Sequence, residues 1–304
     1  MVSRPHTRLL STSHGTNREA FSVTDWALFL TLVLIWGGSF LFMAIGLDHF
    51  HPGLVTFLRV GFGAATLALI PRARHTPIAQ EDWPRVIVLG VIWIALPLTF
   101  FPIAQQWINS AVAGMLNGAM PIFTALVSVA LLRELPGRRQ SFGLVIGFAG
   151  IAAISIPSAG GESTAVVGVA LVLAATICYA FATNIVAPLQ QKYGSLAVLA
   201  RVQWVAVLLV VPYGAVGLGP SEFAWSSLLA ALAVGVLGTG LAFVLMGTLA
   251  GRVGATRASF ITYVIPVVAL VLGVVFRSDQ VSPIAVVGVL LVIVGAFLAS
   301  RREL

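Results

Sequence analysis

WALFLTLVLIWGGSFLFMAIGL, residues 26–47, is an apolar run without a charged side chain. The hydrocarbon core of a bilayer is about 30 Å thick and an α-helix rises about 1.5 Å per residue, so roughly 20 apolar residues span it. Further apolar runs follow, separated by short charged or turn-rich breaks. The sequence therefore predicts ten transmembrane helices, at residues 26–47, 53–70, 84–105, 111–132, 140–157, 165–187, 196–218, 225–249, 257–276 and 282–300.

The overall composition supports the same fold class, an all-α integral membrane protein. Of the 304 residues, 59% are hydrophobic and 9% are charged, and the mean hydropathy is +1.03. Soluble domains carry about 25% charged residues, so this chain cannot cover a water-facing surface with polar groups and needs the lipid bilayer as its solvent. We expect a polar cytoplasmic tail at residues 1–25, five helices at 26–157, five more at 165–300 and a short tail at 301–304.

The positive charges collect on one side of this predicted topology. The net charge of +7 would suggest nucleic-acid binding in a soluble protein. Here all 17 Lys and Arg residues except Arg59, Arg201 and Arg277 lie in the terminal tails, in the even-numbered loops or at their edges. Cytoplasmic loops are enriched in Lys and Arg. We therefore expect both termini in the cytoplasm, a bacterial inner membrane and no nucleic-acid partner.

Several function classes lack their usual sequence signals. Cys178 is the single cysteine and lies inside an apolar run, so it forms no disulfide within the chain and no metal site. His49 and His51 are a weak metal pair, and solvated loop residues are the simpler interpretation. The sequence shows neither a catalytic motif nor a selectivity filter. We expect no enzyme, no channel, no cofactor and no metal; a membrane-embedded enzyme is the alternative from another class.

An internal repeat relates the two halves of the chain. Shifting the early spans by 142 positions places Arg59 on Arg201, each followed by Val. Shifting the later spans by 145 positions superposes Pro121 on Pro266, Glu134 on Asp279, Gly143 on Gly288 and Gly150 on Gly295. Each half has five predicted spans, an odd number, so the second half enters the membrane from the opposite face. Inverted repeats are typical of transporters that bind substrate between the halves, near the midplane.

Two motifs resemble a known family. Trp36-Gly37-Gly38-Ser39-Phe40, followed by an Arg early in the second span, resembles the drug/metabolite transporter superfamily in its EamA-type branch, as does the stretch from Ala113 to Ile154. The resemblance extends over nearly the whole chain after residue 25 and, within the branch, is greatest to the YddG-like exporters of aromatic amino acids. It implies a cavity lined by spans one to four and six to nine, with spans five and ten outside. Asp279 departs from the usual Glu.

The only charges within the predicted spans are Arg59 and Arg201. A buried Arg in a membrane is costly and usually faces protein or water. Its functional role would be the capture of a substrate carboxylate, which a guanidinium binds in a bidentate manner. A structural role is the alternative, in which each Arg reaches the near interface or caps carbonyls. The symmetric positions favour that alternative, because a substrate needs only one Arg.

Polar side chains within the spans are further candidates for the cavity. Such groups need partners in hydrocarbon and should point inward, where they bind substrate or join helices. The predicted set is Ser39, Asn117, Tyr179, Thr183, Thr239, Thr262 and Tyr263.

Aromatic side chains at helical spacing form a third candidate group. Trp36, Phe40 and Met43 share one face of span one, because positions i, i+4 and i+7 lie on one side of a helix. Trp93 and Phe101 in span three and Trp204 in span seven belong to the same group. An aromatic-lined pocket suits an apolar or aromatic solute. Lipid-facing or packing roles are the alternative for each residue taken singly.

Pro97, Pro121 and Pro266 are predicted to interrupt their helices and to act as hinges or cavity-shaping positions, because proline removes one backbone hydrogen bond. A tolerated kink is the alternative.

These observations predict an exporter of small organic metabolites, with aromatic or apolar amino acids as the expected substrates. We expect alternating access and facilitated transport, because the spans hold no Asp, Glu or His away from their ends and Arg does not release a proton. A proton-coupled exporter of other amphipathic metabolites or drugs is the alternative. The chain is expected to act as a monomer or a homodimer.

Overall fold

The computed structural model describes residues 21–74, 76–132, 137–159 and 163–299, and every regular element in these ranges is a helix. Seven helical stretches are long and apolar enough to cross a membrane, and three shorter apolar helices, Pro52–Ala68, Ile261–Arg277 and Pro283–Ala299, complete the predicted set. The all-α fold with ten spans is thereby confirmed.

The first five spans run from α1 to α8. They are α1 (Val23–Leu47); α2 (Pro52–Ala68); the consecutive segments α4 (Trp83–Leu89), η2 (Gly90–Ala95) and α5 (Leu96–Ala104); the pair α6 (Ser110–Asn117) and α7 (Met120–Leu132); and α8 (Arg138–Ala159). The short helices α3 (Pro71–Arg74) and η1 (Gln80–Asp82) join α2 to α4.

The last five spans run from α9 to α15. They are α9 (Ser163–Tyr193); α10 (Ser195–Leu218); the consecutive segments α11 (Trp225–Ala233), η3 (Val234–Leu241) and α12 (Ala242–Val253); the pair α13 (Ala255–Ala258) and α14 (Ile261–Arg277); and α15 (Pro283–Ala299).

Repeat-equivalent helices pack against each other in antiparallel pairs, as inverted halves require. In the pair α2 and α10, Gly53 near the start of α2 lies against Tyr213 near the end of α10. Farther along α2, the Val60 carbonyl accepts a hydrogen bond from Gln203, nearer the start of α10. The pairs α6 with α14 and α8 with α15 cross in the same sense. The second half therefore runs through the bundle in the direction opposite to the first.

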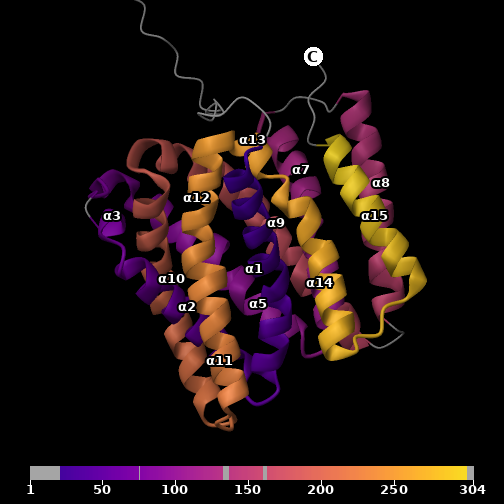
Figure 1. Cartoon of the computed structure of the whole chain (residues 1–304), viewed down its shortest axis with the longest axis horizontal. Coiled ribbons are helices and arrows are strands. Elements are labelled where there is room, and N and C mark those ends of the chain that lie inside the picture. The colour runs from indigo at the N-terminus through magenta and orange to yellow at the C-terminus, as the bar shows by residue number, and fades with distance from the viewer. Residues whose placement is uncertain (1–20, 75, 133–136, 160–162, 300–304) are drawn as a thin grey trace, which may run out of the picture.

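The pair α8 and α15 forms one edge of the bundle (Figure 1). A Cβ added to Gly150 would lie 2.7 Å from the Gly288 carbonyl oxygen, and one added to Gly295 would lie 2.5 Å from the Gly147 Cα. Only glycine permits so close an approach of two backbones. Small residues take this role in membranes because lipid leaves little hydrophobic force to hold helices together.

Two π-helical turns replace α-helix at repeat-related positions. η2 precedes Pro97, which has no N–H to donate, and η3 contains Thr239, whose hydroxyl donates to the Val234 carbonyl oxygen at 3.2 Å. A side chain inserted into the backbone ladder in this way widens a helix. The sequence predicts an interruption at Pro97 in the third span but no π turn in either span. Such π turns are frequent at functional sites.

The three predicted helix interruptions differ in kind. Span four is broken between α6 and α7, and Pro121 is the second residue of the new helix, where its missing N–H has no intrahelical role. Pro266 lies inside α14, after the break between α13 and α14, and faces Gly118. Pro97 follows the π turn η2. Their hinge function stays a prediction.

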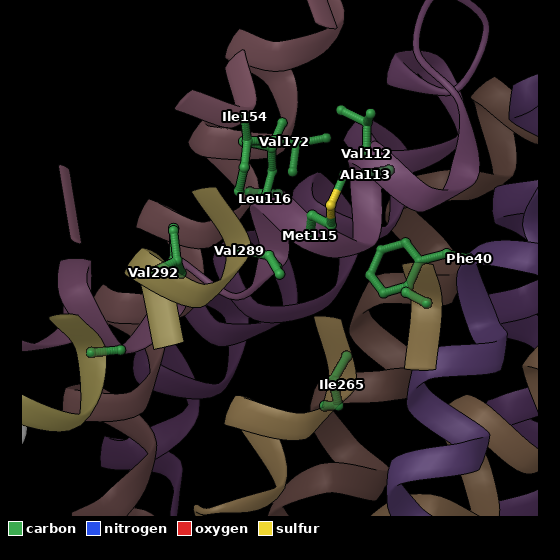
Figure 2. Close-up of a cluster of buried hydrophobic side chains, with 14 of the residues drawn as sticks. Phe40, Val112, Ala113, Met115, Leu116, Ile154, Val172, Ile265, Val289 and Val292 are labelled. Carbon is green, nitrogen blue, oxygen red and sulfur yellow. The ribbon is translucent and has the colours of Figure 1, made fainter. Parts of the chain in front are cut away.

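The largest core cluster joins the two halves around α6. Figure 2 shows the side chains of Val112 to Leu116 between Phe40 of α1 on one side and Ile154, Val289 and Val292 on the other. Gly114 lies against Phe40 and Ala269, where an added Cβ would be 3.2 Å from the Phe40 ring and would clash with the Ala269 Cβ. This packing holds Phe40 against α6, on the side that also faces Ala269 of α14.

We name the bundle end that holds Leu47 the outer end and the end that holds Val23 the inner end. We predict that Gly219→Cys is labelled by an impermeant maleimide in intact cells, whereas Gly251→Cys is protected. Gly219 caps α10 at the outer end, and Gly251 lies in the last turn of α12 at the inner end. Both are exposed, and an added Cβ meets nothing within 4 Å, so neither cysteine disturbs packing.

Both variants are made with Cys178→Ala to remove the native thiol, and permeabilised cells serve as the control in which both cysteines react. Labelling of Gly251→Cys alone in intact cells would reverse the orientation that the charge distribution predicts.

Candidate functional site

A buried arginine occupies the middle of α2. Arg59 is 7% exposed. Its Nε donates to Thr239 Oγ1 at 3.1 Å, and its Nη1 donates to Met43 Sδ at 3.0 Å. Because the Thr239 hydroxyl itself donates to Val234, its lone pairs are left to face the guanidinium. The helices α1, α2 and η3, from both halves of the chain, therefore meet at one positive charge.

No described carboxylate neutralises that charge. The ion pairs of the described residues lie at or beyond helix ends, and none includes Arg59. A guanidinium has five N–H donors, and the thioether of Met43 is a weak acceptor. Arg59 thus retains donors in an interior where an isolated charge is expensive, an arrangement that suits an anionic ligand.

The repeat partner of Arg59 has different surroundings. Arg201 on α10 is half-buried and donates to the Ala73 carbonyl oxygen in the short helix α3, toward the inner end. The positions equivalent to Met43 and Thr239 under the repeat are Ile185 and Ile94. The two arginines match in the sequence, but only Arg59 lies in a polar site at the centre of the bundle.

Aromatic side chains form a wall next to Arg59. The Phe40 ring meets Phe101 edge-on, with centroids 5.4 Å apart, and Phe101 lies 6.2 Å from the ring of Tyr179 on α9. Tyr179 is near enough to Arg59 for the two side chains to interact electrostatically. Three helices therefore contribute one polar aromatic ring and two apolar rings to a single group, which adjoins the Arg59 site through Tyr179.

A second aromatic group continues from the site toward α12. Trp36 donates from Nε1 to the Gly238 carbonyl oxygen in η3 at 3.0 Å, and its ring meets Phe243 at 5.7 Å. Trp93 meets the same Phe243 ring at 5.6 Å. The π turn η3 therefore holds Trp36 through Gly238 and Arg59 through Thr239.

Ser39 packs on the same turn from α1. Its hydroxyl donates to the Ile35 carbonyl oxygen of its own helix at 2.8 Å. A Cβ added to Gly238 would lie 2.7 Å from Ser39 Oγ.

Other predicted candidates lie away from this cluster. Trp204 is 50% exposed on the surface of the bundle. The hydroxyls of Thr262 and Thr183 donate to the backbone carbonyl oxygens three residues earlier, those of Ser259 and Ala180. The Tyr263 hydroxyl donates to the Ala296 carbonyl oxygen of α15. Asn117, at the end of α6, has a buried Oδ1 without a hydrogen-bond partner.

The structure adds residues that sequence analysis missed. Gln203 is fully buried on α10 and donates to the Val60 carbonyl oxygen at 3.0 Å. The sequence could have indicated Gln203, because it is the only amide side chain in the predicted span 196–218. Phe243, which joins Trp36 to Trp93, has no such signal because it is one aromatic residue among many apolar ones.

At the outer end the two halves are held together by ionic and polar contacts. Arg277 binds both carboxylate oxygens of Asp48, at 2.7 and 2.8 Å. Asp279 accepts from Ser110 Oγ at 2.6 Å and from the Ala111 N–H at 2.9 Å, so its charge lies at the positive end of α6. These contacts connect the ends of α1 and α6 with the end of α14.

The loop after α1 is held by the second half as well. His49 Nδ1 lies 3.2 Å from Ser227 Oγ, and the His51 N–H donates to Ser221 Oγ at 2.8 Å. A cavity of about 430 Å³ opens beside this loop, and its lining includes Gln106. This cavity lies at the outer end, and its lining does not include Arg59.

Contacts between the halves also connect them at the inner end. Asp25, fully buried, pairs with Arg252 of α12 at 2.6 Å. Asp82 accepts from Lys192 and from the Tyr193 hydroxyl, each at 2.8 Å. Contacts between the halves therefore lie on both sides of the Arg59 site, toward the inner end and toward the outer end.

Proteins that this chain resembles over most of its length are named as exporters, efflux pumps or transporters. A probable terminal-alkyne amino-acid exporter of Streptantibioticus cattleyicolor is 27% identical, over 92% of this chain and 94% of that protein. A probable amino-acid metabolite efflux pump of Salmonella typhimurium is 24% identical, over 90% and 94%. The uncharacterized transporter YoaV of Bacillus subtilis is 26% identical, over 90% and 97%. A solved crystal structure, 20% identical, superposes with a TM-score of 0.61 over 92% of this chain and 97% of that one, and shows the fold alone.

The EamA-like transporter family matches the chain twice, over residues 26–156 and 166–301. The two matches coincide with the two five-helix halves that the internal repeat and the antiparallel helix pairs define. The protein is a multi-pass membrane transporter and not an enzyme, and it belongs to the EamA-like transporter family.

Proposed function

We propose that the protein exports amino acids or related carboxylates with an aromatic or apolar side chain, and that Arg59 receives the carboxylate. The observation that carries the proposal is the buried guanidinium, which has no acidic partner among the described residues. A carboxylate would fill the remaining donors of the guanidinium with charge-assisted hydrogen bonds.

The surroundings of Arg59 support the same solute class. The aromatic group of Phe40, Phe101 and Tyr179, which adjoins the Arg59 site through Tyr179, suits a solute with an apolar side chain. Relatives bear the names amino-acid exporter and amino-acid metabolite efflux pump. Aromatic amino acids, as in the YddG-like exporters, are our first choice.

The asymmetry between the repeats argues against a purely structural role for Arg59. A structural arginine required by the pseudo-two-fold packing would keep equivalent partners in both halves. Arg201 instead donates to Ala73 of α3, and the positions equivalent to Met43 and Thr239 are isoleucines, Ile185 in the second half and Ile94 in the first.

Contacts between the halves on either side of one site support transport by alternating access. In this proposal the outer contacts of Arg277 and Asp279 separate to release solute, while the inner contacts of Asp25 and Asp82 hold; the reverse set separates to load it. The membrane is the bacterial inner membrane, both termini face the cytoplasm, and residues 26–157 and 165–300 act as the two moving units, in a monomer or a homodimer.

We further propose that transport is facilitated and not proton-driven. The described acidic residues lie at helix ends or in loops, where Asp25, Asp48 and Asp82 are engaged in ion pairs. Arg59 stays protonated and cannot carry protons. The alternative is a proton-coupled exporter of amphipathic metabolites or drugs that uses Glu134, which lies outside the described residues.

The carboxylate role predicts a difference between two chemically equal substitutions. Arg59→Met should reduce the exchange of labelled phenylalanine in proteoliposomes by about 10- to 100-fold, because hydrogen bonds to a charged group contribute roughly 1.5–3 kcal/mol. Arg201→Met, the control at the repeat-related position, should retain exchange within about fivefold. Size-exclusion profiles establish that both variants are folded. Equal losses in the two variants would refute a substrate role specific to Arg59.

The outer closure predicts a rescue by charge exchange. Arg277→Asp places two carboxylates together and should increase the labelling rate of a Ser39→Cys reporter from outside about two- to fivefold, the magnitude of a partly exposed ion pair. Asp48→Arg should do the same, and the double exchange should restore slow labelling. Rates that stay equal in all four proteins would show that this pair does not close the outer end.

Facilitated transport predicts equilibration without accumulation. Proteoliposomes with equal phenylalanine on both sides should show no net movement when a pH gradient is imposed, since the described acidic groups lie at helix ends or in loops. Sustained uphill accumulation driven by the gradient is the contrary result, and Glu134→Gln would then identify the coupling acid.

A further inference from the structure

A buried amide oxygen on α10 has no partner. Gln203 is fully buried, and its Nε2 donates to the Val60 carbonyl oxygen at 3.0 Å. Its Oε1 is also buried and accepts no hydrogen bond. Leaving an acceptor unpaired in a water-poor interior is unfavourable by several kcal/mol relative to an apolar side chain. The polar atom therefore calls for an explanation other than helix packing.

This amide lies beside the Arg59 site. Val60, which accepts from Gln203, follows Arg59 in α2. One turn later, a Cβ added to Gly63 would lie 3.0 Å from Gln203 Nε2 and 2.8 Å from the Thr239 methyl group. Gln203 and Thr239, which binds Arg59, thus contact the same turn of α2, where the absence of a side chain at Gly63 leaves room for both.

The repeat does not require an amide at this position. The residue equivalent to Gln203 in the first half is Gly61, where an added Cβ meets nothing within 4 Å. A leucine could cover the same apolar surface of α2 without an unpaired oxygen. Two other amide oxygens, on Gln105 and Asn117, are also unpaired, but both residues are only partly buried, and Gln105 donates to the Phe40 carbonyl oxygen of α1 and not to α2.

Arg59 has N–H donors without an acceptor among its contacts, and Gln203 Oε1 is an acceptor without a donor. An α-amino acid carries the complementary pair on one carbon, a carboxylate that accepts and an ammonium that donates. We propose that Gln203 Oε1 receives the ammonium group of the solute, so that the site selects zwitterionic α-amino acids over carboxylates that lack the amine. This inference rests on the proposed carboxylate role of Arg59 and adds the residue that determines specificity for the amine.

The experiment compares solutes that differ only in the amine. Labelled phenylalanine exchange in proteoliposomes is inhibited with unlabelled phenylalanine or with 3-phenylpropionate. In the wild-type protein phenylalanine should inhibit at a concentration about 10- to 100-fold lower, as expected for a hydrogen bond to a charged group. In Gln203→Leu the two solutes should inhibit within about threefold of each other, with the constant for 3-phenylpropionate unchanged.

An isosteric variant keeps the test independent of packing. Gln203→Glu retains the shape of the side chain and places a negative charge near Arg59. It should weaken inhibition by 3-phenylpropionate and strengthen inhibition by phenethylamine, which has the amine alone. Size-exclusion profiles and melting temperatures verify that both variants are folded.

The outcomes separate the two proposals. If Gln203→Leu preserves the preference for phenylalanine, or weakens both solutes equally, Gln203 is a structural residue and the inference fails while Arg59 keeps its role. If Arg59→Met leaves inhibition by 3-phenylpropionate unchanged, the proposed function fails. A wild-type protein that does not distinguish phenylalanine from 3-phenylpropionate overturns the inference directly.

Discussion

The absence of water within the bilayer governs this structure. Backbone polar groups in the hydrocarbon must be paired within the chain, which leaves helices as the spanning elements. Lipid also removes most of the hydrophobic force between helices, so close packing has to hold them. The approach of α8 to α15 through Gly150 and Gly295 answers that requirement at the edge of the bundle. In such a medium any polar atom left unpaired is conspicuous, which makes Arg59 and Gln203 informative.

The site illustrates how irregular backbone and polar side chains support each other. Thr239 uses its hydroxyl proton on Val234 and thereby stabilises the wide turn of η3, and the same oxygen accepts from Arg59. Gly238 in that turn exposes its carbonyl to the Trp36 indole. The π turn is thus the element through which the second half of the chain contacts the arginine of the first half. Substitution of Thr239 would affect backbone shape and charge solvation together.

The sequence predicts the spans well because hydropathy is a local property. The first span was expected at 26–47 and forms at Val23–Leu47, where a capping box between Ser22 and Asp25 starts the helix earlier than the apolar run. The π turns were not predictable from hydropathy, since they depend on specific hydrogen bonds such as that of Thr239. The difference between Arg59 and Arg201 was equally hidden. Their sequence contexts match, and their distinction comes from distant partners, Met43 and Thr239 for one and Ala73 for the other.

The antiparallel pairing of equivalent helices has an evolutionary consequence. A duplicated chain holds two copies of each position. The membrane-spanning architecture depends on both copies, whereas a ligand between the halves needs each polar group only once. After duplication the second copy is released from that requirement. Arg201, which now tethers α3, and Ile185 and Ile94, which stand opposite Met43 and Thr239, show where the halves have diverged. New solute preferences can therefore arise in one half while the other maintains the scaffold.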